Sequence, residues 1–209
     1  YVPRPLEEEL RRDIICPNCG LEHAVFGLAT WCPDCGKDIF MCHVKTEFGV
    51  IQKVLSVVDK RREELGARVA GRDIENGLED VVSVFEAVLK IITIKHLANN
   101  GMSHDEISKR LEKIRNSYQN INSAGETFHA QTGLDLFHNT SQDEVETLRT
   151  IFEKRHPLTH NLGVVDKKYL ERVRTGDTEG REIRVTAQEV EIAIGISKKI
   201  ISSVYNLCT

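Results

Sequence analysis

Four of the six cysteines in this 209-residue chain form two copies of the pattern Cys-Pro-x-Cys-Gly. The first copy contains Cys16 and Cys19, and the second contains Cys32 and Cys35. Two residues between the thiols let one tight turn direct both sulfur atoms at a metal, and the following glycine accepts a positive φ. The doubled pattern predicts a tetrahedral four-cysteine site that holds one structural zinc ion and leaves no coordination position open for catalysis.

The segment around these cysteines, residues 14–45, resembles the zinc-ribbon or rubredoxin-like knuckle family. The resemblance implies a small β module folded around the metal. His23 and His43 are close in sequence, but four thiolates already complete the coordination. The other two cysteines, Cys42 and Cys208, stand alone and are expected to be buried free thiols. A redox function of the Cys-x-x-Cys pairs is the less favoured alternative.

A second group of reactive side chains lies in the segment Arg155-His156-Pro157-Leu158-Thr159-His160-Asn161. A guanidinium can hold a phosphate and its developing charge, while an imidazole, which titrates near neutral pH, can move a proton. RNA carries its own nucleophile, the 2′-hydroxyl, so such a site needs no catalytic metal. We therefore expect Arg155 and His160 to be catalytic, with His156 in a supporting role.

The spacing of Arg155 and His160 sets a geometric condition on this site. On an ideal helix five positions advance by about 500°, so the two side chains would point about 140° apart. Either Pro157 breaks the helix and lets them converge, or a second copy of the motif completes the site. Structural roles remain as alternatives: His156 can cap the preceding helix, and Arg155 can be a solvated surface charge.

The elements that position both groups are predicted mostly from helical periodicity. After residue 45 apolar residues recur at helical spacing, first at Val50, Val54, Val57 and Val58 and then along residues 74–92. Helix starts are predicted from capping boxes at Ser103/Glu106, Ser141/Glu144 and Thr186/Glu189. Further predictions are a helix end at residues 99–101, a kink or end at Pro157, a short helix over 166–172 and turns over 173–185.

These patterns predict a mainly α protein in which a small zinc-ribbon β module precedes a helical bundle. The expected organisation is an N-terminal helix or linker over residues 1–13, a four-cysteine zinc ribbon over 14–45 and a helical bundle over 46–209.

The predicted bundle, together with Arg155, His156 and His160, resembles the HEPN family of helical-bundle proteins, many of which are metal-independent ribonucleases. The family signature is an arginine, a polar residue and, a few residues later, a histidine, and residues 161–170 extend the likeness. The resemblance implies a homodimer in which both motifs face one cleft, with the imidazole in acid–base chemistry and the guanidinium stabilising the phosphate. It also implies RNA as substrate, a 2′,3′-cyclic phosphate product, and a toxin-like or antiviral-defence effector with an antitoxin or other protein as a further partner.

Charge and hydropathy limit the other function classes. The chain has 28 basic and 32 acidic residues, and residues 1–45 are also acidic overall, which argues against a DNA-binding regulator that acts through the ribbon. The longest apolar stretch, residues 81–94, is shorter than the ~20 residues of a membrane span, and no signal segment opens the sequence. We therefore expect a cytoplasmic endoribonuclease without a membrane partner. The alternative is a non-catalytic HEPN and zinc-ribbon module that binds RNA or partner proteins.

Overall fold

The computed structural model describes residues 11–25, 27–173 and 175–208. The chain divides into two compact units, Tyr1–Val50 and Ile51–Thr209. The described residues are mainly helical, and they contain one two-stranded antiparallel sheet that precedes the helices. The prediction of a mainly α protein with a small β element at its start is therefore confirmed.

The first unit is built on a hairpin and two cysteine turns. Strands β1 (Arg12–Ile15) and β2 (Glu22–Val25) pair antiparallel, with Ile14 opposite His23. Gly20 and Gly36, each directly after a cysteine pair, adopt φ of 75° and 66°, which glycine tolerates without a steric penalty. The small core consists of Ile14, Cys16, Cys32 and Ile39.

Two boundaries differ from those expected. The strand β1 begins at Arg12, inside the expected N-terminal helix or linker, whose residues 1–10 lie outside the described part of the chain. Helix α2 (Phe40–Ser56) begins before the expected end of the ribbon at residue 45. It starts there because the Asp38 carboxylate accepts a hydrogen bond of 3.0 Å from the backbone N–H of Phe40.

The apolar face predicted for α2 was partly wrong. Val50 and Val57 are 52% and 44% exposed, whereas Phe48 and Leu55 are buried. Helix α2 ends at Ser56, so Val57 and Val58 do not continue its face. The large side chains Phe48 and Leu55 bury more apolar area than valine, and they determine which side of the helix is buried.

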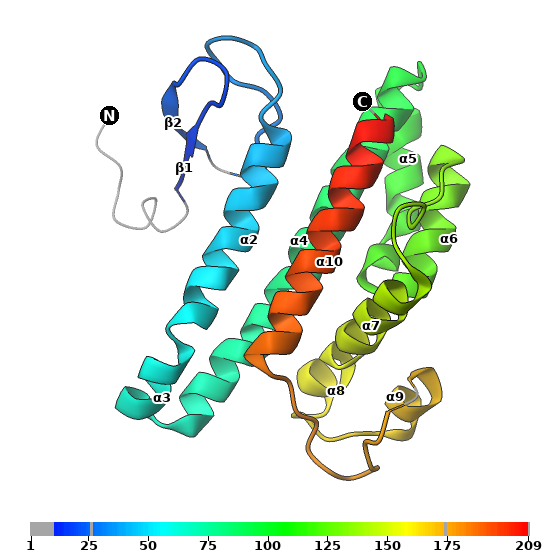
Figure 1. The fold of residues 1–209 in the computed structure, drawn as a ribbon. Coiled ribbons are helices and arrows are strands. Elements are labelled where there is room, and N and C mark those ends of the chain that lie inside the picture. The colour runs from blue at the N-terminus through cyan, green and yellow to red at the C-terminus, as the bar shows by residue number, and fades with distance from the viewer. Residues whose placement is uncertain (1–10, 26, 174, 209) are drawn as a thin grey trace. The chain divides into compact units, whose positions relative to one another are not determined.

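The second unit is a helical bundle arranged around one long helix (Figure 1). Its helices are α3 (Val58–Leu65), α4 (Ala67–Asn99), α5 (His104–Ile114), the 3-10 helix η1 (Ser117–Gln119), α6 (Ile121–Thr132), α7 (Gln142–Glu153), α8 (Arg155–His160), α9 (Lys167–Arg172) and α10 (Ala187–Cys208). Helix α4 contacts α3, α5, α6, α8, α10 and η1, and α10 also packs on α7. Residues along α4 at helical spacing, such as Leu78, Val81 and Phe85, are fully buried, so α4 is the centre of the core.

The sequence signals for helix ends are confirmed. Side chain and backbone exchange hydrogen bonds at both residues of the boxes Ser103/Glu106, Ser141/Glu144 and Thr186/Glu189. Helix α4 ends at Asn99 and is followed by Gly101 with φ of 81°. The short helix predicted over 166–172 is α9.

Candidate functional site

The segment that contains Arg155 and His160 forms a separate short helix, α8, which Lys154 alone separates from the end of α7. Pro157 lies in the first turn of α8. A continuous helix would need an N–H at this position to bond the carbonyl of Glu153, and the proline ring would clash with that carbonyl. The break expected at Pro157 is therefore present, displaced to Lys154. A hydrogen bond of 2.8 Å from the Thr159 hydroxyl to the Glu79 carboxylate links α8 to α4.

Arg155, His156 and His160 line one pocket of about 470 Å³. The other residues that line it come from η1, α7, α8, α9 and the residues next to η1: Asn116, Gln119, Asn120, Phe152, Glu153, Thr159, Lys168 and Arg172. Arg155 and His160 thus line one pocket of a single chain, although both lie within α8 and the break at Lys154 leaves the angle between them unchanged.

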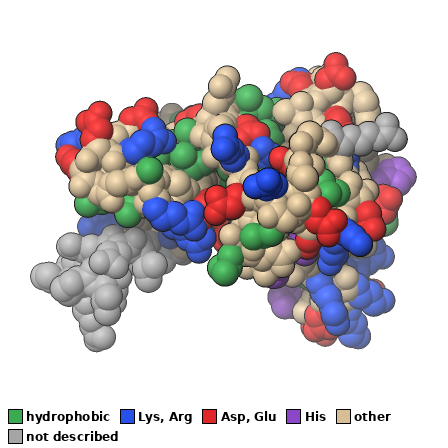
Figure 2. Space-filling view, turned by 90° about the horizontal axis from the view of Figure 1, so that it is seen from below, with side chains coloured by type: hydrophobic (Ala, Val, Ile, Leu, Met, Phe, Trp, Pro, Cys, Tyr) green, Lys and Arg blue, Asp and Glu red, His purple; other side chains and the backbone are tan. Residues whose placement is uncertain are grey.

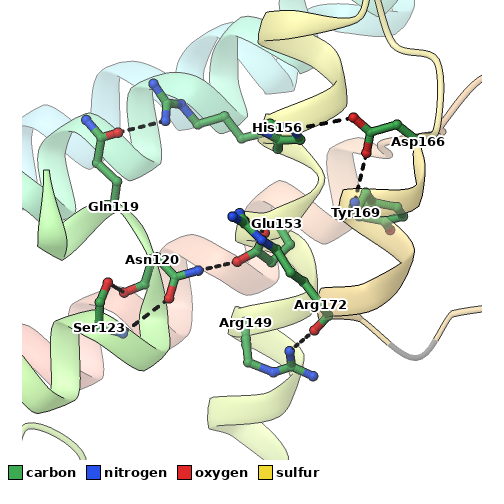
Figure 3. A network of polar contacts seen from close by, with 10 residues as sticks. Gln119, Asn120, Ser123, Arg149, Glu153, His156, Asp166, Tyr169 and Arg172 are labelled. Atoms are coloured by element: carbon green, nitrogen blue, oxygen red, sulfur yellow. Dashed lines mark hydrogen bonds and ion pairs between the residues drawn. The ribbon is translucent and has the colours of Figure 1, made fainter.

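The two histidines of the segment lie beside each other in this pocket. The centroids of their rings are 5.2 Å apart, and the ring planes are inclined by 54°. The Nε2 atom of His156 lies 3.5 Å from Oδ2 of Asp166 (Figure 3). Burial lowers the pKa of His156, and the Asp166 carboxylate partly opposes this effect. His156 is held in place by Asp166, whereas His160 is exposed to solvent.

The guanidinium of Arg155 is held by η1. Its Nη1 atom donates a hydrogen bond of 2.9 Å to Oε1 of Gln119. Its Nε atom is buried and has no hydrogen-bond partner among the described residues. Such unpartnered buried donors are uncommon in folded proteins, which makes this arginine distinct from an ordinary surface charge.

The pocket carries a positive charge in a chain whose formal net charge is −4. Its lining includes Arg155, Lys168 and Arg172 against one carboxylate, that of Glu153. Glu153 is only 6% exposed, and it accepts hydrogen bonds from Asn120 and from Nη1 of Arg172. On the face seen from below, basic side chains gather at the lower right, and elsewhere acidic and basic side chains lie next to one another (Figure 2). The local excess of cations suits an anionic ligand such as a phosphate.

The four cysteines of the doubled pattern form a second candidate site. The sulfur atoms of Cys16, Cys19, Cys32 and Cys35 all lie within 4.8 Å of one another. The pairs Cys16/Cys35 and Cys19/Cys32 are each 3.7 Å apart, far longer than the ~2.05 Å of a disulfide. A tetrahedral ion with metal–sulfur bonds of about 2.3 Å requires sulfur atoms about 3.8 Å apart. The four cysteines can therefore hold a metal ion, as the sequence predicted.

Backbone groups favour the thiolate form of two of the four cysteines, whereas the pKa of Cys19, although lowered by a backbone hydrogen bond from Leu21, is raised to about 12 by burial and by the neighbouring cysteines. A backbone hydrogen bond from Lys37 is the main cause that lowers the pKa of Cys35 to about 6, and one from Cys19 lowers the pKa of Cys16. His43, which is close to the cysteines in sequence, is fully buried and has other partners. Its Nδ1 accepts the N–H of Ala29 at 2.8 Å, and its Nε2 lies 3.1 Å from Glu47.

Of the two other cysteines, Cys208 is buried, as expected, and burial raises its pKa to about 11. Cys42 is only partly buried, so the expectation of a buried thiol was wrong for this residue.

Several lining residues of the α8 pocket were not anticipated from the sequence. Gln119 and Asn120 lie at η1 and Arg172 lies on α9, and no spacing in the sequence connects them to Arg155. Only their tertiary contacts bring them to the motif.

No protein-family model, curated protein or solved structure matches the chain. Within the described ranges, no helix is both long and apolar enough to cross a membrane.

Proposed function

We propose that this protein is a metal-independent endoribonuclease of the HEPN type, with its active site in the α8 pocket. The observation that supports this proposal most is that Arg155, His156 and His160 line the same cavity as Lys168 and Arg172. The pocket thus combines proton carriers with cations that suit a phosphodiester, which are the two requirements for RNA cleavage by the 2′-hydroxyl.

The reaction can be assigned to these residues step by step. The imidazole of His160 accepts the proton of the 2′-hydroxyl as that oxygen attacks the adjacent phosphorus. The bond from phosphorus to the 5′-oxygen then breaks, and the imidazolium returns a proton to the departing oxygen. Arg155 stabilises the charge on the phosphoryl oxygens, and His156 supports the ring of His160 from its position beside Asp166. The products are a 2′,3′-cyclic phosphate and a 5′-hydroxyl.

The test is cleavage of single-stranded RNA by the purified protein in the presence of EDTA. We expect activity in the wild type, a loss of at least ~10² in rate for His160→Ala, and a smaller loss for His156→Ala. Arg155→Lys should also be impaired, because an ammonium cannot reproduce the fork of a guanidinium. The product ends should be cyclic phosphates.

Matched controls come from the same unit. His138, an exposed histidine bonded to Ser203, does not line the pocket, so His138→Ala should keep full activity. An obligatory requirement for Mg²⁺, or full activity in His160→Ala, would show that this pocket is not a metal-independent active site.

The second candidate function is a non-catalytic module that binds RNA or a partner protein. The hydrogen bond from Arg155 to Gln119 favours it, because a guanidinium held in this way can bind a phosphate without any chemical step. Binding of RNA that is lost in Arg155→Ala, with no cleavage by the wild type, would support this candidate over the nuclease.

The proposal has two further parts. The cluster of four cysteines holds one structural zinc ion per chain, since four thiolates with tetrahedral spacing are a typical zinc site. The resemblance to the HEPN family also supports a homodimer through the motif face and a role as a toxin-like or antiviral-defence effector.

A further inference from the structure

A line of polar contacts connects α4 to Arg155 through the 3-10 helix η1. Nζ of Lys90 lies 2.7 Å from Oε1 of Glu86, within α4. The other oxygen of Glu86 accepts a hydrogen bond of 2.6 Å from Nε2 of Gln119. Oε1 of Gln119, whose side chain is labelled in Figure 3, in turn accepts the 2.9 Å hydrogen bond from Arg155, a residue that lines the pocket. Gln119 thus joins a residue of the central helix to the motif.

The chemistry of the partners determines which way the amide of Gln119 points. Glu86 is only 9% exposed, and an ionised carboxylate can only accept hydrogen bonds. A guanidinium can only donate them. The amide NH2 must therefore face Glu86 and the amide oxygen must face Arg155, because the flipped amide would lose both contacts.

Because the amide of Gln119 is uncharged, it can hold Arg155 without forming an ion pair. The carboxylate of Glu86 is paired with Lys90 and is separated from Arg155 by the amide. Gln119 therefore restrains the guanidinium of Arg155. Because the amide is neutral, this contact does not cancel the positive charge of the guanidinium. A carboxylate in the same place would form an ion pair with Arg155 and compete with an anionic ligand.

We infer that Gln119 is a positioning residue, oriented by Glu86, which holds the guanidinium of Arg155 in place for a phosphate without neutralising it. The inference rests on the proposed function for its consequence on RNA, but the restraint on Arg155 exists independently of any substrate. The two statements can therefore be tested separately on the same full-length protein.

The first measurement is made by NMR on protein labelled with ¹⁵N-arginine, without RNA. The guanidinium signal of Arg155 is assigned by its absence in Arg155→Lys. We expect slow rotation of this guanidinium in the wild type and faster rotation in Gln119→Leu. The matched control is Gln131→Leu, because Gln131 also accepts a hydrogen bond from an arginine, Arg110, but lies outside the pocket. Unchanged rotation in Gln119→Leu would overturn the inference.

The second measurement is the rate of single-stranded RNA cleavage by the same variants. Gln119→Leu should lower kcat/KM by about tenfold or more, the effect of losing one hydrogen bond to a charged group. It should add no further loss in the Arg155→Lys background, which a general structural defect would not reproduce. Gln119→Glu should lose at least as much, since it keeps the size of the side chain but neutralises Arg155 and repels Glu86.

The outcomes separate the two statements. Faster rotation of Arg155 in Gln119→Leu, without RNA cleavage by the wild type, supports the positioning role and contradicts the nuclease. Cleavage that needs Arg155 but is unaffected in both Gln119 variants overturns the positioning role and leaves the nuclease intact. Should Gln119→Leu fail to fold, as judged by circular dichroism, Gln119→Ala, which also removes the contact to Arg155, takes its place in both measurements.

Discussion

The two carboxylate oxygens of Asp166 contact the start of α9, the side chain of Asn161 and the ring of His156. Oδ1 accepts the backbone N–H of Tyr169 at 2.8 Å and so caps the start of α9. Oδ2 accepts a hydrogen bond of 2.6 Å from the Asn161 side chain and faces His156. The backbone N–H of Tyr169 is the main cause that lowers the pKa of Asp166, so the carboxylate stays ionised at neutral pH. One residue therefore couples the position of α9 to the imidazole of His156.

We predict that Asp166→Asn lowers the pKa of His156 below its value in the wild type. Burial already lowers it, and the carboxylate favours the imidazolium and opposes that shift. Removal of the negative charge leaves burial unopposed, so the neutral form persists to lower pH. Asparagine is also a good helix cap, which preserves the start of α9. The pKa is measured by NMR titration of the His156 ring.

The matched control is Asp105→Asn beside His104. That pair is also an aspartate and a histidine, but its side chains are 94% and 97% exposed, so water screens the charge. Asp105→Asn should therefore leave the NMR titration of the His156 ring unchanged. A rise in the pKa of His156 in Asp166→Asn, or no change, would contradict the role given to the carboxylate.

Among the elements, α7 matters because it leads directly into α8 and the motif. The capping box of α7 also contacts α10. The Glu144 carboxylate completes the box with Ser141 and lies 2.7 Å from Nζ of Lys199 on α10. Lys199 is the first cause that lowers the pKa of Glu144 to about 2. Because this pKa is below that of the unfolded chain, the contribution of Glu144 to stability is present above about pH 4.5 and is lost as the pH falls towards 2.

We expect Ser141→Ala to lower the free energy of unfolding by about 1 kcal/mol, the usual effect of removing a helix cap. Urea denaturation followed by circular dichroism measures the change. Ser83→Ala is the control, because Ser83 lies inside α4, where its hydroxyl bonds only the carbonyl of Glu79. A smaller loss for Ser141→Ala than for Ser83→Ala would show that the box does not stabilise α7.

For the cysteine module, we expect one zinc ion per chain in the wild type and in Cys42→Ser, and its loss in Cys16→Ser. Cys16 is one of the four clustered thiols, whereas Cys42 belongs to the same unit but lies outside the cluster. Elemental analysis gives the zinc content, and hydrogen exchange should show lost protection in residues 11–50 after chelation, because metal binding and folding are coupled. Protein purified without chelator that contains no stoichiometric zinc would contradict the assignment.

For the whole molecule, the proposed homodimer requires an apolar contact on the motif face. Leu162, two residues after His160, is 91% exposed and adopts φ of 52°, a conformation that is unfavourable for leucine. Strained backbone conformations cluster at functional sites, and an exposed leucine at such a position is available for contact with a second chain.

We therefore expect Leu162→Glu to shift the protein from dimer to monomer in analytical ultracentrifugation and to lower the activity per chain. The control is Leu65→Glu on α3, at a leucine that is 57% exposed. A wild type that is monomeric at all concentrations and still cleaves RNA would contradict the dimer but not the pocket.

Local patterns in the sequence determined much of this protein. The clustering of the four cysteines, the three capping boxes and the helix end at residues 99–101 were all predicted and are present. The boxes and the helix end depend on groups within a few residues of one another, and each pair of cysteines needs only one tight turn. The apolar face of α2 was misplaced, since its buried side is selected by the packing of Phe48 and Leu55 and not by the periodicity of valines.

The environment of the motif was decided only by the tertiary structure. Arg155 and His160 could be identified as reactive residues, but the pocket that they line depends on the packing of α8 against α4 and α7 and on the nearby η1 and α9. Gln119 and Arg172 reach Arg155 and Glu153 from helices separated in sequence by loops. Hydrogen bonds of this kind follow from the folding of the whole bundle around α4, and no short-range pattern in the chain encodes them.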